Sequence, residues 1–214
     1  MVIPREAGRI TYSANIRNMK RIQLDEYQKA VIVGSLLGDA YLEATWSKTN
    51  YRLGIRHSKM QSEYVQWLYE KLKSLVLTPP QHYERTQSIW FRTISHPELS
   101  GLHSVFYRAG KKVIPEAIKE YLSDPITIAV WFMDDGNAVF KNGKVGGYHL
   151  NTQSFSEAEN RCLVDTMAAA IGIRCTLERN HGYYRLAIYQ RDAREAFRAL
   201  IYEHMLPSMV YKLG

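Results

Sequence analysis

The sequence has few of the features that build disulfide, zinc or membrane proteins. It contains two cysteines, Cys162 and Cys175, in apolar stretches and without zinc-ligand spacing, so a disulfide framework is excluded and both are expected to be reduced core residues. No apolar run reaches the roughly 20 residues that span a bilayer. The first residues also lack the apolar stretch of a secretory signal, so none is expected.

Low-complexity segments are absent too, and the hydrophobic content of 46% is sufficient for a core. A length of 214 residues suits one large domain or two of about 100 residues. The net charge of +7 favours a polyanionic partner. Basic proteins are common, however, so the charge alone decides little.

The most informative stretch is 126–136, an apolar run that ends in Asp134, Asp135 and Gly136. Pro125 before it and the terminal glycine predict a short buried helix. A helix C-terminus carries about −0.5 of an elementary charge, which disfavours a carboxylate there by about 0.3–1 kcal/mol. Broken local rules concentrate at functional sites. A divalent cation would be attracted by both the carboxylates and the helix dipole.

A second copy of this pattern occupies 32–40, where Asp39 takes the place of Asp135. Gly34 and Gly38 are four residues apart and share one helix face. Each glycine costs about 1 kcal/mol relative to alanine inside a helix. We therefore expect a second helix backbone to approach closely at these glycines. The alternative is a pair of unrelated buried helices that end in solvated aspartates.

Around these helices the sequence predicts helix, hairpin, helix, hairpin, helix, and then the same order again. The expected elements are a helix from Asp25 as N-cap, a hairpin at 41–57, a helix at 62–76, a hairpin at 82–95, helices at 97–109 and 116–122, a helix at 126–135, a hairpin at 137–154, a helix from Ser156 to near Gly172, a hairpin at 173–189 and a helix at 192–205. The expected domains are a loosely ordered lead-in at 1–24 and two halves at 25–123 and 124–214, which form one compact pseudo-dimeric unit.

Alternation in the first hairpin places Leu53 and Ile55 on one face and Arg52 and Arg56 on the other. An antiparallel sheet can leave such a face open, and Arg, Tyr, Asn and Gln side chains suit phosphates and base edges. The alternative is an ordinary solvated sheet surface. The candidate DNA-binding residues are Arg52, Arg56, Arg85, Arg92, Lys111, Asn151, Gln153, Arg174, Asn180 and Arg185.

The paired motifs resemble those of the LAGLIDADG homing endonucleases, of the single-chain type with two motifs. The resemblance covers about 20–210, and its segments are 36–41, 76–80, 111–115, 131–136, 150–155 and 209–213. Trp-Phe-Met-Asp-Asp-Gly followed by Asn-Thr-Gln-Ser-Phe is a specific combination. One departure is that the second motif lacks the paired glycines of the first, so the contact between the helices must be asymmetric.

The resemblance implies an α+β fold of two pseudo-symmetric αββαββα halves. Their antiparallel sheets would form a DNA-binding saddle, with the motif helices packed at its centre. It also implies site-specific, metal-dependent hydrolysis of both DNA strands at a long target, which leaves 3′ extensions. The chain would act as a monomer in intron homing, because it carries both motifs.

By position, the resemblance implies that Asp39 and Asp135 are catalytic metal ligands, with the Ala40 backbone as a further ligand. Asp134 is the alternative second ligand. Lys112 and Lys212 would be catalytic basic residues beside the acids, or plain phosphate contacts, and Asn180 matches a polar residue near the site. The expected cofactor is Mg²⁺, which Mn²⁺ would replace, whereas Ca²⁺ would bind without supporting cleavage.

Three other functions fit the same scaffold. An intron-RNA maturase would bind RNA to help splicing, a DNA-binding regulator would not cleave, and a nickase would have one competent half-site. Both motif acids are present, which favours retained cleavage without excluding a second role. The target sequence, the host and the compartment are left open by the sequence.

Overall fold

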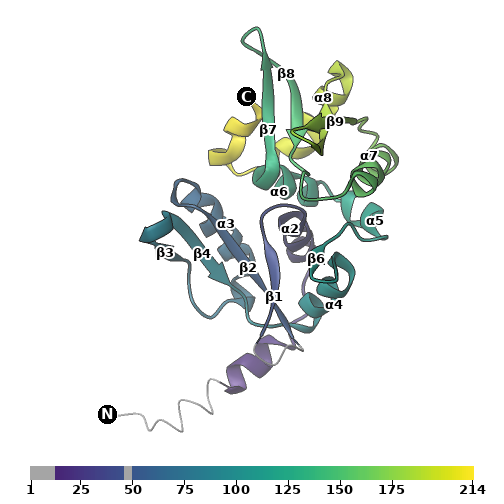
Figure 1. Cartoon of the computed structure of the whole chain (residues 1–214). Helices are drawn as coiled ribbons and strands as arrows, with labels where there is room; N and C mark the ends of the chain where they lie inside the picture. The colour runs from purple at the N-terminus through teal and green to yellow at the C-terminus, as the bar shows by residue number, and fades with distance from the viewer. Residues whose placement is uncertain (1–12, 46–49) are drawn as a thin grey trace. The chain divides into compact units, whose positions relative to one another are not determined.

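The computed structural model describes residues 13–45 and 50–214 (Figure 1). Contacts divide the chain into two compact units. The first contains the chain up to Gln28 and Tyr41–Gly101, and the second contains Lys29–Ala40 and Leu102–Gly214. Most of the first motif helix therefore groups with the later part of the chain. The division into halves near 123–124 stays a prediction.

The first unit is built on a four-stranded antiparallel sheet with the order β1-β2-β4-β3. Its elements are β1 (Tyr41–Ala44), β2 (Tyr51–Ser58), α3 (Ser62–Leu72), β3 (Gln81–Tyr83) and β4 (Ser88–Arg92). Short 3-10 helices at Lys59–Gln61, Lys73–Leu75 and Glu84–Thr86 join them. The predicted hairpin turn near 47–50 and the predicted core position of Trp46 lie largely outside the described residues.

Alternation along β2 has the predicted outcome. Leu53 and Ile55 are buried on the face that packs against α3, whereas Arg52 and Arg56 lie on the opposite face. The prediction of a loosely ordered lead-in is wrong for 13–19, which form a helix.

The second unit repeats the sheet, with the order β7-β8-β10-β9. Its elements are α2 (Glu26–Leu37, from Lys29 onward), α4 (Pro97–Phe106, from Leu102 onward), β5 (Tyr107–Arg108), β6 (Lys111–Lys112), α5 (Ile118–Leu122), α6 (Pro125–Asp135), β7 (Gly136–Lys141), β8 (Lys144–Leu150), α7 (Glu157–Ile171), β9 (Thr176–Asn180), β10 (Tyr183–Ile188), α8 (Arg191–Tyr202) and a 3-10 helix at Pro207–Leu213. The identical strand order in both sheets confirms the predicted repeat of architecture.

Local sequence signals account for several helix ends. Asp25 caps α2 by accepting a hydrogen bond from the Gln28 N–H at 2.7 Å. Ser156 and Glu159 form the predicted capping box of α7, and Gly172 ends that helix with a φ of 71°. The fourth helix stops at Phe106, earlier than predicted, because the chain turns back there and pairs β5 with β6.

The core of the second unit lies between its sheet and α6, α7 and α8. The ring of Phe132 on α6 packs edge to face against the rings of Tyr148 on β8 and Phe197 on α8. The ring centroids are 5.8 Å and 5.4 Å apart. These apolar contacts bury one face of the sheet and leave the other for polar side chains. The prediction that Cys162 is a core residue is wrong, because it is exposed, and Cys175 is half-buried.

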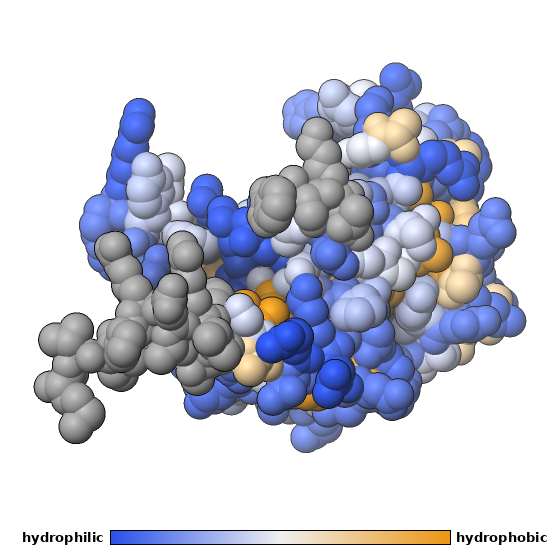
Figure 2. All heavy atoms as spheres, turned by 90° about the horizontal axis from the view of Figure 1, so that it is seen from below, coloured by the Kyte–Doolittle hydropathy of each residue, from blue (hydrophilic) through white to orange (hydrophobic). Residues whose placement is uncertain are grey.

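Polar side chains cover most of the surface seen in Figure 2. The apolar areas there are small and separated from one another. Across the described part of the chain, no helix has both the length and the hydropathy that a membrane crossing requires.

Candidate active site

The two motif helices, α2 and α6, pack closely within the second unit. A Cβ added to Gly34 would come within 2.5 Å of the Thr127 carbonyl oxygen and 2.7 Å of the Val130 Cβ. A Cβ on Gly38 would overlap the side chain of Asp134. Real Cβ atoms do not tolerate such distances, so both positions require glycine. The expected close approach of a second helix at these glycines is confirmed.

The contacts also follow the alignment of the two motifs. When Asp39 is aligned with Asp135, Gly34 corresponds to Val130 and Gly38 to Asp134, and these are the pairs that meet. Contact between equivalent positions is typical of an approximate two-fold axis. Each glycine faces a larger side chain of the other helix, as the missing glycines of the second motif predicted.

The motif acids lie where the helices end. Asp39 is exposed just after α2, and Asp135 is the half-buried last residue of α6. Asp134 is buried and accepts a hydrogen bond from the Asp39 backbone N–H at 3.2 Å. One oxygen of Asp134 therefore links the two helix ends, which favours Asp135 over Asp134 as the second ligand.

Three carboxylates close together create an unfavourable electrostatic environment. Burial and, to a smaller extent, the charges of Asp39 and Asp134 raise the pKa of Asp135 to about 7, against the lowering effect of Lys112 and Lys212. Like charges disfavour ionisation of each other, and a divalent cation would reverse that effect.

Each helix end is also contacted by one lysine. The Nζ of Lys112 donates to the carbonyls of Gly38 and Ala40, both at 2.8 Å. The Nζ of Lys212 donates to the carbonyl of Asp134 at 2.7 Å. Because Gly38 and Asp134 are equivalent, the two lysines occupy equivalent places. They satisfy carbonyls that a helix C-terminus leaves without intrahelical partners.

Burial lowers the pKa of Lys112 and of Lys212, while the charges of the three aspartates oppose that shift. Each buried ammonium group therefore depends on the acids beside it to remain charged. The proposed ligand atom of Ala40, its carbonyl oxygen, already accepts one of the hydrogen bonds from Lys112.

The donors available to a metal are few. Among the described residues, no group of three or more His, Cys, Asp or Glu side chains could hold a metal ion by itself. Mg²⁺ usually binds through one or two carboxylates and completes its shell with water and substrate phosphates. Asp39 and Asp135 fit that pattern, with a nucleic-acid phosphate as the third kind of ligand.

Asn151, predicted as a DNA contact, is tied to the acidic site. Its backbone N–H and its Nδ2 both donate to the Asp135 carbonyl, at 3.0 and 2.7 Å. The same Nδ2 donates to the Oδ1 of Asn137 at 3.0 Å. The Nε2 of Gln153 donates to the Oδ1 of Asn151 at 3.5 Å. Sequence reasoning missed Asn137, which carries no motif signal of its own.

The other DNA-binding candidates lie on the sheets or beside them. Strand parity places Arg52, Arg56 and Arg92 on the open face of the first sheet, and Asn180 and Arg185 on that of the second. The β9–β10 turn, which Asn180 precedes, lies at the same end of its sheet as Gly136. The remaining candidates, all exposed, are Arg85 in a 3-10 helix, Lys111 in β6 and Arg174 before β9.

The site thus consists of two helices that meet through equivalent positions, and each helix end carries an acid and its own lysine. This is a two-motif site with approximate two-fold symmetry. The sequence model of the LAGLIDADG DNA endonuclease family matches residues 29–195. The chain belongs to this family.

Individual relatives include endonucleases and maturases. The chain is 26% identical over 200 residues to the probable intron-encoded endonuclease 1 of Wickerhamomyces canadensis, covering 89% of this chain and 85% of that one. It is 29% identical over 203 residues to the cytochrome b mRNA maturase bI2 of Debaryomyces hansenii, covering 89% and 75%.

Solved structures share the fold. The homing endonuclease I-WcaI, bound to its DNA recognition sequence, superposes with a TM-score of 0.83 at 24% identity, over 93% of this chain and 92% of that one. I-DmoI in complex with DNA and Mn gives a TM-score of 0.52 at 19% identity, over 84% and 98%. These similarities confirm the α+β fold that the sequence predicted.

Proposed function

We propose that the chain is a site-specific endonuclease that hydrolyses both strands of a long DNA target with Mg²⁺ and leaves 3′ extensions. One observation carries the proposal. Asp39 follows α2 and Asp135 ends α6, the two helices approach closely at Gly34 and Gly38, and each helix end holds its own lysine. Two equivalent sets of acid and lysine match the two scissile phosphates of a duplex.

Asp39 and Asp135 would hold the metal ions at the helix ends. When bound, Mg²⁺ supplies an activated water and neutralises charge that develops on the phosphate. Asp134 keeps Asp39 in place through its hydrogen bond to the Asp39 N–H. I-DmoI, which shares the fold, has been described with DNA and Mn, which supports a divalent ion in this role.

Lys112 and Lys212 place buried positive charge beside the acids. An ammonium group held in place before the reaction stabilises phosphoryl charge without reorganising. Asn151 holds the Asp135 backbone from the other side. These residues form a rigid frame in which the protein positions charge rather than forming a covalent intermediate.

Double-stranded DNA is the proposed partner of the open sheet faces. Their arginines, asparagine and tyrosines are suited to phosphates and major-groove base edges. I-WcaI, the neighbour with a TM-score of 0.83, is described bound to its recognition sequence, which supports this assignment. A monomer suffices because one chain carries both motifs.

The test is cleavage of a randomised duplex library in Mg²⁺, with the cut ends sequenced, beside the variants Asp39→Asn and Asp135→Asn. Staggered cuts at one long motif, absent from both variants, are the expected result. The melting temperatures of the variants show whether they are folded. Tight duplex binding in Ca²⁺ without cuts in Mg²⁺ would instead indicate a non-cleaving DNA-binding regulator.

A second function is favoured by the 29% identity to a cytochrome b mRNA maturase. An intron-RNA maturase would use the same scaffold to bind structured RNA, with or without DNA cleavage. Binding of the chain to structured intron RNA, measured against a scrambled RNA of equal length, tests this role. If the protein bound intron RNA and neither bound nor cut duplexes, the endonuclease proposal would be wrong.

A further inference from the structure

The strands of each four-stranded sheet carry a single acidic residue, and both of these residues lie on the open face. They are Glu43 on β1 and Glu178 on β9. A carboxylate on a surface that meets a polyanion repels the phosphates. Its presence in the same setting in both sheets therefore needs a reason other than general affinity for DNA.

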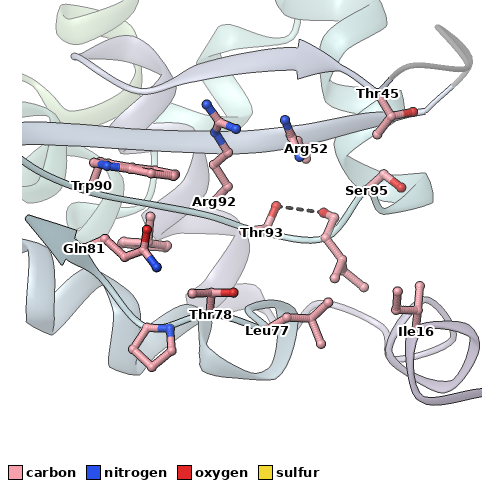
Figure 3. A pocket seen from close by; sticks show the side chains of 13 residues that line it. Ile16, Thr45, Arg52, Leu77, Thr78, Gln81, Trp90, Arg92, Thr93 and Ser95 are labelled. Carbon is pink, nitrogen blue, oxygen red and sulfur yellow. Dashed lines mark hydrogen bonds between the residues drawn. The ribbon is translucent and has the colours of Figure 1, made fainter. Parts of the chain in front are cut away.

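In the first sheet, Glu43 lies between two arginines of neighbouring strands. Its Oε1 accepts a hydrogen bond from the Nε of Arg52 at 2.8 Å and lies 3.1 Å from the Nε of Arg92. Arg92 also stacks over the ring of Trp90, 4.7 Å from its centroid. In Figure 3 the two guanidinium groups point to the same side, away from Leu77 and Thr78.

These residues adjoin a hollow of about 370 Å³ at the edge of the sheet. Arg52, Arg92 and Trp90 line its upper wall as drawn in Figure 3. The stems of the arginines are thus packed against other side chains while their charged ends face outward. About one third of each arginine side chain is exposed, 33% for Arg52 and 35% for Arg92.

In the second sheet, Glu178 lies opposite Arg185, and one of its oxygens accepts hydrogen bonds from the Nε of Arg185 at 2.9 Å and from the Nη2 of the same side chain. The other carboxylate oxygen accepts the hydroxyl of Tyr189. His149 joins the group, with its Nε2 at 2.9 Å from the Tyr189 hydroxyl. The Tyr189 ring lies so close to Gly147 that a Cβ there would come within 2.5 Å of it. Arg185 is therefore held in a packed polar network.

We propose that Glu43 and Glu178 are positioning residues for DNA specificity, which hold Arg52, Arg92 and Arg185 in the orientation that reads guanine. The proposal rests on the proposed endonuclease function. The Nε of Arg52 and the Nε of Arg185 each donate to a glutamate, and the Nε of Arg92 lies at ion-pair distance from Glu43. One terminal amino group of Arg185 also donates to Glu178. The outer N–H groups of each guanidinium are then left for the paired hydrogen bonds to guanine O6 and N7. Ordering before binding reduces the side-chain entropy lost in the complex.

A purely structural role explains the arrangement less well. Ion pairs that are partly exposed contribute little to folding stability. The two glutamates also occupy different strands of their sheets, β1 and β9, which are not equivalent in the repeat. Each should therefore affect a different part of the target, as a chain that reads an asymmetric sequence requires.

The test compares the full-length chain with Glu43→Gln and Glu178→Gln on libraries in which each base pair of the cleaved target is varied. We expect each variant to lose about tenfold in discrimination against the wrong base at a few adjacent base pairs, a different set for each variant. We also expect binding to random duplex in Ca²⁺ to become about two- to threefold tighter, because a repulsive charge is gone.

Three matched variants separate position from charge. Glu70→Gln and Glu157→Gln remove the same charge from α3 and α7, where each residue pairs with a basic residue three or four positions further along the chain. Both variants should leave discrimination between bases unchanged. Glu43→Asp keeps the charge but shortens the side chain. It should lose discrimination like Glu43→Gln without binding random duplex more tightly.

Unchanged discrimination in both glutamine variants would overturn the inference. So would an even loss over the whole target together with a lower melting temperature, which would indicate a structural role. If the unmodified chain neither cut nor bound duplex DNA, the proposed function itself would fail. Specific cutting by the unmodified chain with identical profiles in the variants would refute this inference alone.

Discussion

At the scale of single residues, Asp135 has an acid–base behaviour that can be measured. Burial raises its pKa from 3.8, the ordinary value of an aspartate, to about 7 in the folded chain. Between these values the folded chain binds more protons than the unfolded chain, so stability falls as the pH rises from about 4 to about 7. Above pH 7 the cost of the buried charge is complete.

The variant Asp135→Asn should therefore stabilise the metal-free protein at pH 8. The expected gain in the free energy of unfolding is about 2–4 kcal/mol, given about 1.4 kcal/mol for each unit by which the pKa is raised. At pH 4 the gain should vanish. Chemical denaturation of both proteins across this range measures the effect, and equal gains at pH 4 and pH 8 would contradict the assigned pKa.

The two lysines lead to a prediction about which strand of the duplex is cleaved. Lys112 contacts the end of α2 and Lys212 the end of α6. Replacing either with methionine removes one of the two equivalent charges, so we expect cleavage of one strand to slow by about 10²-fold, by analogy with the loss of a fixed electrostatic donor. Nicked duplex should then accumulate, and denaturing gels with each strand labelled separately should show one strand cut and the other intact.

The control for the single lysine variants is the double variant, in which both lysines are replaced by methionine. The double variant should cleave neither strand at an appreciable rate while it still binds the target in Ca²⁺. If each single variant slowed both strands equally, the two lysines would not act as separate sets.

At the scale of secondary-structure elements, the α2–α6 crossing depends on its glycines. In Gly38→Ala the added methyl group would overlap Asp134, and overpacking of this kind costs about 1–3 kcal/mol. We expect a lower melting temperature and reduced cleavage, since Asp134 also positions Asp39. Thermal unfolding followed by circular dichroism measures the first effect.

Gly101→Ala is the matched control within a helix. Gly101 lies in α4, where an added Cβ would meet no atom within 4 Å. Alanine should there stabilise the chain by up to about 1 kcal/mol through helix propensity. A loss of stability in Gly38→Ala together with a gain in Gly101→Ala would show that steric contact, and not helix propensity, decides the first result. Equal destabilisation of both variants would show that the helix crossing has no special requirement for glycine.

At the scale of the whole molecule, binding and cleavage should respond differently to removal of divalent ions. With EDTA, cleavage should stop, because Asp39 and Asp135 are proposed to act through a bound cation that supplies the activated water. Duplex binding should persist, since it depends on the basic side chains of a chain with net charge +7. Gel-shift and cleavage assays on the same target measure both. Cleavage that continued in EDTA would rule out the metal role of Asp39 and Asp135.

Binding should also weaken steeply with salt. The logarithm of the association constant should fall with the logarithm of the salt concentration by about 0.9 for each phosphate that is neutralised. Isotherms at several salt concentrations give the number of phosphate contacts. A slope near zero would mean that the open faces do not contact the DNA backbone.

Much of this architecture was already determined by the sequence. Pro125, Asp25 and the Ser156–Glu159 pair act on their own chain neighbours, so the helix starts could be predicted from local chemistry. The alternation of Leu53 and Ile55 with arginines settled the faces of a strand in the same way. The two acidic motifs gave the resemblance to the family, and the paired glycines of the first motif predicted the close approach of the helices.

Other features were decided only by the tertiary structure, because they depend on residues far apart in the chain. The bond from Lys112 to the carbonyl of Gly38 joins positions 74 residues apart, and no local pattern indicates it. The ties of Asn151 to Asp135 and the arginines held by Glu43 and Glu178 likewise follow from strand pairing and packing. The exposure of Cys162 is decided by which face of α7 packs inward. Local propensity determines where elements begin and end, whereas the partners of a polar side chain are set by how those elements pack together.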